Sequence, residues 1–125
     1  MASACASTAD FASTGFPEMQ GVGSGVTLWA LFFPTDPQLM AGKEIKVVWR
    51  MTGRGDLHLD AAGPGGAAVQ PIWGPEPHGS SNWDRPGDEW GTGWLFPNPG
   101  CWTITATRDG SQGYLVVRVA PSLPG

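Results

Sequence analysis

The chain carries few charges and no cluster of basic residues. Its 125 residues include 7 lysine or arginine and 11 aspartate or glutamate side chains, which gives a net charge of -4. Proteins that bind nucleic acid neutralise phosphates with a basic stripe or patch, and this sequence has none. We therefore expect no nucleic-acid partner.

A helical pattern and a long hydrophobic run are also missing. No stretch of about ten residues or more repeats its apolar positions with the period of a helix. The longest apolar run, residues 26–33, is about half the length that a helix needs to span a bilayer. This run is therefore expected to form a strand and not a membrane anchor.

Familiar catalytic motifs are absent as well. The sequence contains no G-x-S-x-G, no H-E-x-x-H and no glycine-rich phosphate loop. Asp88 and Glu89 are adjacent acids, but neighbouring side chains on a strand diverge, and a glycosidase normally needs a larger cleft than so small a domain offers. We expect a protein that is not an enzyme and has no cofactor.

What remains is dominated by turns and alternating apolar residues. There are 19 glycines and 12 prolines, yet 41% of the residues are hydrophobic, so the chain is expected to fold as one domain. Every second residue of EIKVVWRM, from Ile45 to Met51, is apolar, which is typical of a half-buried strand. Glycine turns at residues 63–66 and at Asp109 and Gly110 indicate two hairpins.

The number and spacing of these segments predict an all-β fold, an antiparallel immunoglobulin-like sandwich of about seven strands. The strands are expected near residues 26–33, 43–52, 56–62, 67–73, 90–97, 101–108 and 112–120. The residues expected in the core are Trp49, Trp94, Trp102, Ile104, Val117 and Val119.

The first 24 residues read as a flexible lead, because they are rich in alanine, serine, threonine and glycine and have no apolar period. We place the sandwich domain at residues 25–121 and a tail at 122–125. Ala2-Ser3-Ala4-Cys5 resembles the end of a bacterial lipoprotein signal, where small residues precede a lipid-modified cysteine. The alternative is an ordinary tail with a chance cysteine.

Two cysteines, Cys5 and Cys101, allow one disulfide within the chain. A lipid on Cys5 would prevent that bond and leave Cys101 as a small buried residue at the head of a strand. If the bond forms, it closes a long loop and contributes about 4 kcal/mol, provided that the lead docks onto the domain. We favour a free Cys101.

Four of the seven tryptophans lie in residues 78–102, HGSSNWDRPGDEWGTGWLFPNPGCW. Trp94 and Phe96 precede a proline-rich turn and Trp102 follows it, and their spacing fits inward positions of two strands. We expect these three aromatic side chains in the core.

Trp73, Trp83 and Trp90 lie in or beside a connection longer than most loops without a function. In one interpretation their rings pack onto the domain; in the other, exposed rings stack on a sugar or another ring. We expect a mixture, in which Trp90 is packed and Trp83 is the more exposed ring.

The polar residues of this loop also have two interpretations. If the loop is purely structural, Asp84, Asp88 and Glu89 pair with Arg85 or Arg50. If it binds a ligand, Asn82, Asp84 and Asp88 supply hydrogen bonds to that ligand. The candidate ligand-binding residues are Trp73, Asn82, Trp83, Asp84 and Asp88.

A metal site is the alternative function. Asp56, His58 and Asp60 alternate along one expected strand and share a face, about 6.6 Å apart along the backbone. A zinc or copper shell would need a second element, such as His78 with the acids of the loop folded over that face. A solvated polar face explains the same pattern.

Several segments resemble a group of uncharacterised secreted or lipid-anchored proteins of soil bacteria. They are VVWRMTGRG, WGPEPHGSSNWDRPGDEWGTGWLFPNPGCWTITATR and GYLVVRVA, within roughly residues 25–120. The group has a W-R-x-x-G strand before an F-P-x-P-G-C-W turn and strand. The resemblance implies an extracytoplasmic β-sandwich behind a lipoprotein-type leader, with lipid on Cys5, and it implies no activity.

Taken together, the sequence predicts a non-catalytic binding or interaction module of a bacterial surface lipoprotein or secreted protein. The expected partner is a surface ligand, either carbohydrate or protein. We expect a monomer that contacts the membrane only through a lipid on Cys5.

Overall fold

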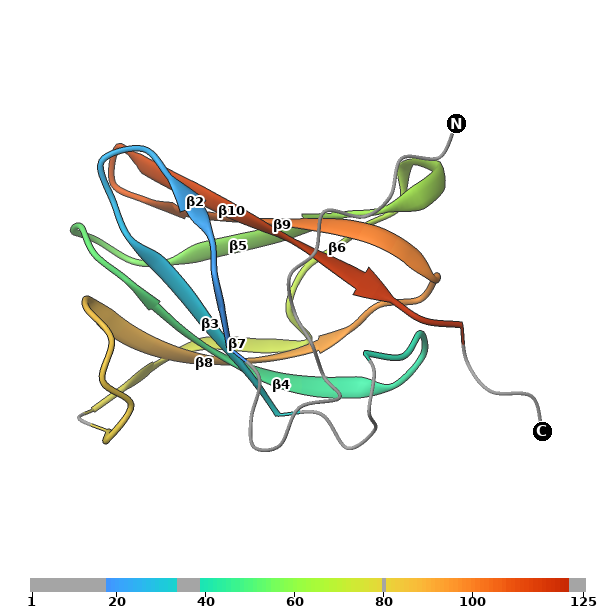
Figure 1. Cartoon of the computed structure of the whole chain (residues 1–125), viewed down its shortest axis with the longest axis horizontal. Helices are drawn as coiled ribbons and strands as arrows, with labels where there is room; N and C mark the ends of the chain where they lie inside the picture. The colour runs from blue at the N-terminus through green and yellow to red at the C-terminus, as the bar shows by residue number, and fades with distance from the viewer. Residues whose placement is uncertain (1–17, 34–38, 80, 122–125) are drawn as a thin grey trace.

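Ten strands account for most of the described residues, 18–33, 39–79 and 81–121, in the computed structural model. They form two antiparallel sheets of five strands each, which lie face to face as a β-sandwich (Figure 1). In sheet order, sheet A contains β1 (Glu18–Gln20), β3 (Leu28–Phe33), β4 (Glu44–Met51), β8 (Asp88–Leu95) and β7 (Trp73–His78). Sheet B contains β2 (Val22–Gly23), β10 (Ser111–Val119), β9 (Gly100–Arg108), β5 (His58–Ala62) and β6 (Ala68–Val69).

The predicted all-β antiparallel sandwich is confirmed. In the part of the chain that the structure describes, the helical content is a single 3-10 turn, η1 (Pro64–Gly66). The two expected hairpins are β5–β6 and β9–β10, and Gly110 has the positive φ of 67° that its tight turn requires. The immunoglobulin-like type stays a prediction.

Three strands were not expected from the sequence: β1, β2 and β7. The first two lie inside residues 1–24, so the interpretation of that segment as a flexible lead is wrong for residues 18–23. β1 pairs with β3 and buries Met19, and β2 pairs with β10. Strands of three and two residues are too short to show a period in the sequence. Residues 1–17 and 122–125 lie outside the described residues.

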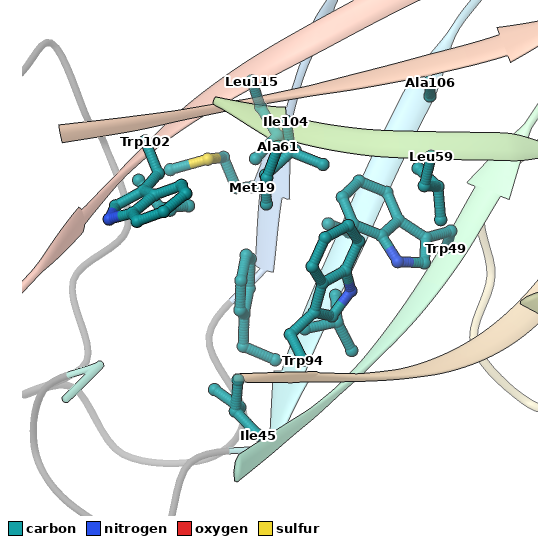
Figure 2. Packing of buried hydrophobic residues seen from close by; sticks show 14 of the residues in the cluster. Met19, Ile45, Trp49, Leu59, Ala61, Trp94, Trp102, Ile104, Ala106 and Leu115 are labelled. Carbon is teal, nitrogen blue, oxygen red and sulfur yellow. The ribbon is translucent and has the colours of Figure 1, made fainter. Parts of the chain in front are cut away.

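The core lies between the sheets and is rich in aromatic rings (Figure 2). All six residues predicted for it are buried. Neighbouring ring centroids are 6.4 Å apart for Trp49 and Trp94, 5.6 Å for Trp94 and Phe96, and 5.3 Å for Phe96 and Trp102. These rings therefore form one continuous row.

A single threonine satisfies two indole groups inside this row. Thr92 Oγ1 accepts hydrogen bonds of 2.9 Å from the Nε1 atoms of both Trp49 and Trp94, and it donates one of 2.7 Å to the Val47 carbonyl. Buried polar groups need such partners, because they have lost the hydrogen bonds of water. Thr92 therefore fixes the orientation of two large core side chains.

Cys101 differs from the prediction. It is disulfide-bonded and exposed, so the interpretation as a free, buried residue is wrong. Trp102 points inward from β9, and its neighbour on the strand must then point outward. Cys5, the other cysteine of the sequence, lies outside the described residues.

Candidate functional site

The outer face of sheet A carries half-buried aromatic rings among charged side chains. Trp49 and Trp90 are register partners that point into the core. Because side chains alternate along a strand, Arg50 and its register partner Trp29 point outward. Trp73 and Trp83 are half-buried as well. Rings that are neither in the core nor fully covered are what a ligand can stack on.

Trp73 lies flat on sheet A because two glycines of β8 leave room for it. Trp90, Thr92 and Trp94 point inward, so Gly91 and Gly93 occupy the outer face. A β-carbon at Gly93 would overlap the five-membered ring of Trp73, and one at Gly91 would lie 3.6 Å from its Cζ3 atom. The indole therefore spans both glycines, with one ring face on the backbone and the other directed away from the sheet.

A β-bulge in β7 places more than one residue beside this ring. Trp73 pairs with Gly93 and Glu76 pairs with Gly91, with a register shift between them. Gly74 makes the bulge possible, because it has a φ of 82° and a β-carbon there would collide with the Gly91 carbonyl. Trp73 and Glu76 consequently share the outer face, although strict alternation would separate them.

Four polar residues lie on the same face of sheet A as the Trp73 indole. Its Nε1 donates to Glu44 Oε2 at 3.3 Å. Lys46 is the register partner of Gly93, and Glu76 is that of Gly91. A β-carbon on Gly91 would lie 3.0 Å from His78 Nε2, so this imidazole lies next to the benzo edge of the indole. We call Trp73 with Glu44, Lys46, Glu76 and His78 the Trp73 site.

Glu89 of β8 contacts His78 of β7 and fixes the orientation of its imidazole. His78 Nδ1 lies 3.2 Å from Glu89 Oε2, and Ser81 Oγ donates to Glu89 Oε1 at 2.6 Å. Arg50 pairs with the same carboxylate at 2.9 Å, as predicted for one of the acids of this stretch. Glu89 is buried, and the Arg50 guanidinium compensates its charge while Ser81 and His78 contact its oxygens.

Residues 81–87 lie over the outer face of sheet A and reach β1. Arg50 Nη1 donates to the carbonyls of Arg85 at 2.7 Å and Gly87 at 3.2 Å. Arg85 forms a bidentate pair with Glu18 of β1, with both distances 2.8 Å. The expected pairing of Arg85 with an acid of its own loop is therefore wrong, because Glu18 lies in the segment taken as a flexible lead.

Trp83 and Trp29 are held by the same ion pair. Trp83 Nε1 donates to Glu18 Oε1 at 3.1 Å, and the Arg85 guanidinium lies 3.9 Å from the Trp29 ring centroid. The Arg85 guanidinium lowers the pKa of Glu18. One face of Trp29 is thus covered, and Trp83 is half-buried with Asn82 and Asp84 exposed on either side. Trp90 is 6% exposed, which confirms that it is packed.

A cleft of about 600 Å³ opens beside this region, at one end of the sandwich. Its lining brings together three predicted candidates, Asp56, His78 and Asp88. Asp88 pairs with Arg108 at 2.8 Å and not with Arg50 or Arg85. Arg108 also donates to the Met51 and Gly55 carbonyls, at 2.7 and 2.9 Å, which ties the two sheets together at this end.

The predicted metal ligands lie on different sheets. His58 and Asp60 are exposed on β5 of sheet B, where Asp60 Oδ1 accepts from Gln70, whereas His78 belongs to sheet A. Asp56 precedes β5 and lines the cleft. Within residues 18–33, 39–79 and 81–121, no three His, Cys, Asp or Glu side chains lie close enough to hold a metal ion.

The sequence predicted Trp73 as a candidate residue but not its position over Gly91 and Gly93. The signal was present in WGTGW, because alternation on a strand puts both glycines on the face opposite the tryptophans. It also missed Glu18, Trp29 and Arg108, which belong to the site region only through contacts over long sequence separations.

Comparison with protein-family models, with curated proteins and with solved structures finds no match for this chain. The resemblance to bacterial surface proteins therefore stays a prediction. Among the described elements there is no helix that is long and apolar enough to cross a membrane.

Proposed function

We propose that the protein is a non-catalytic, extracytoplasmic binding domain that takes carbohydrate at the Trp73 site. The observation that carries this proposal is the Trp73 ring, which rests on Gly91 and Gly93 and is only half-buried. A pyranose ring has an apolar face of C–H groups that packs on an indole, while its hydroxyls bond to polar groups at the ring edge. Leu95, 37% exposed on the same face, extends the apolar surface.

The charged groups of the neighbouring cleft favour a structural over a catalytic role. Glu89 and Asp88 are each paired with an arginine, at 2.9 and 2.8 Å. Both guanidinium groups also donate to backbone carbonyls, Arg50 to Arg85 and Arg108 to Met51, so the two ion pairs belong to contacts that hold the fold together. Binding without chemistry is therefore the function that these residues support best.

Trp83, Asn82 and Asp84 are secondary candidates. Trp83 already donates its indole N–H to Glu18, and Arg50 lies 5.9 Å from its ring centroid, so its interactions are mostly internal. A ligand longer than one sugar would reach it across the outer face of sheet A. Metal binding gains no support from the arrangement of the histidines.

The disulfide at Cys101 supports a location outside the cytoplasm, because disulfides persist in oxidising compartments. A bond within the chain must use Cys5, which then has no thiol left for a lipid. We therefore favour a secreted protein over a lipoprotein. Non-reducing peptide mapping of protein exported from a bacterial host should recover Cys5 and Cys101 in one linked peptide. Lipid on Cys5 would contradict this.

Replacing Trp73 with alanine should weaken carbohydrate binding about 10- to 100-fold, because the stacking surface and its apolar contact area are removed. A glycan array followed by titration calorimetry on the best ligand measures the effect. Trp29→Ala is the matched control: it removes a half-buried tryptophan from the same face, one whose ring is covered by Arg85. Binding that survives Trp73→Ala, or an array without a ligand, would refute the proposal.

A further inference from the structure

The charges around Trp73 are unevenly placed. Lys46 projects towards β3, where its Nζ lies 5.1 Å from the Phe33 ring centroid, and so away from the indole over β8. Glu44 accepts a hydrogen bond from the Trp73 indole. Glu76 is the register partner of Gly91, the glycine that lies beneath the benzo edge of the indole. Glu44 and Glu76 are both exposed. The immediate surroundings of the exposed ring face are therefore acidic.

The hydrogen-bonding groups at the ring edge are mainly acceptors. A carboxylate only accepts hydrogen bonds. Glu44 accepts from the indole itself, and Glu76 is the register partner of Gly91 under the ring. These two carboxylates fit the hydroxyl groups of a sugar, which can donate to them.

We propose that the Trp73 site selects neutral sugars and excludes acidic ones, with Glu44 and Glu76 as the residues that determine this specificity. The inference rests on the proposed carbohydrate function and names the class of sugar. A uronate or sulfate group on a sugar stacked at Trp73 would face two carboxylates at close range. The net charge of -4 on the chain adds to this repulsion at longer distance.

The size of the discrimination follows from Coulomb's law. A ligand carboxylate about 6 to 10 Å from two glutamates in water is disfavoured by about four- to tenfold in affinity. Added salt reduces the effect, because screening acts strongly between exposed charges. Specificity that depends on ionic strength is therefore part of the expected behaviour.

Matched pairs of oligosaccharides test this inference directly. Each pair has the same linkage and stereochemistry and differs only in the oxidation of C6: cellohexaose with its glucuronate hexamer, mannohexaose with its mannuronate hexamer, and galactohexaose with its galacturonate hexamer. Calorimetry at low salt should give a neutral ligand that binds about four- to tenfold more tightly than its acidic counterpart. An acidic member that binds equally well or better would overturn the inference.

A double variant, Glu44→Gln with Glu76→Gln, assigns the effect to these residues. Glutamine keeps an acceptor for the Trp73 N–H, so the ring should stay in place, while the neutral-to-acidic affinity ratio should fall towards one. Asp60→Asn with Asp109→Asn changes the net charge equally on sheet B and should leave the ratio unchanged. An unchanged ratio in the Glu variant would overturn the role of Glu44 and Glu76. If no hexamer binds, or Trp73→Ala binds like the parent, the carbohydrate function itself fails.

Discussion

Replacing Thr92 with valine should lower the free energy of unfolding by about 3 to 5 kcal/mol, although the two side chains are nearly the same size. The Thr92 hydroxyl is fully buried and takes part in three hydrogen bonds, with Trp49 Nε1, Trp94 Nε1 and the Val47 carbonyl. Valine would leave two indole N–H groups buried without partners and would remove the added bond to the Val47 carbonyl, which lies on a strand paired on both sides. Each such group costs about 1 to 3 kcal/mol. Denaturant unfolding with an unchanged m-value measures the loss.

Thr105→Val provides the control for this substitution. Thr105 lies on the outer side of β9, half-buried, so the same chemical change there should alter stability by no more than about 0.5 kcal/mol. If Thr92→Val is as stable as the parent, the hydroxyl does not support the tryptophan row, and the indoles find other acceptors.

Local sequence patterns were enough to predict strand β4 and the hairpin of β9 and β10. The apolar positions of EIKVVWRM became the buried face of β4, and the Asp109–Gly110 turn joined β9 to β10. Both signals are local, since a period of two and a glycine with positive φ depend only on neighbouring residues. The error at Cys101 arose because this rule was not applied to it: a strand that buries Trp102 must expose Cys101.

The candidate site depends on contacts that a local pattern does not contain. Trp73 was a candidate, but its flat position requires the register of β7 on β8 and the bulge after Trp73. Glu18 and Arg85 are 67 positions apart, and Arg108 and the Met51 carbonyl are 57 positions apart. Such contacts form only when the strands assemble. The sequence therefore indicated charged residues of the site but not the residues that they contact.

Replacing Trp102 with alanine should destabilise the domain by about 3 to 5 kcal/mol, which is typical of removing a buried tryptophan. The ring is fully buried, its centroid lies 5.3 Å from that of Phe96, and its Nε1 donates to the Asn98 carbonyl at 2.9 Å. Gly63 packs so closely on this ring that a β-carbon there would overlap it, so the space left by alanine is bounded by backbone and does not refill easily. Thermal unfolding should show a fall in Tm of at least about 10 °C.

The matched comparison for Trp102 is Trp83→Ala, which removes the same side chain from a half-buried position in the loop that lies over sheet A. Its main loss is one hydrogen bond to the partly exposed Glu18, worth about 1 kcal/mol. The two variants should therefore differ in stability by at least about 2 kcal/mol, with Trp102→Ala the less stable. Equal stability would mean that Trp102 does not connect the two sheets energetically, and the row of rings from Trp49 to Trp102 would then not act as one core.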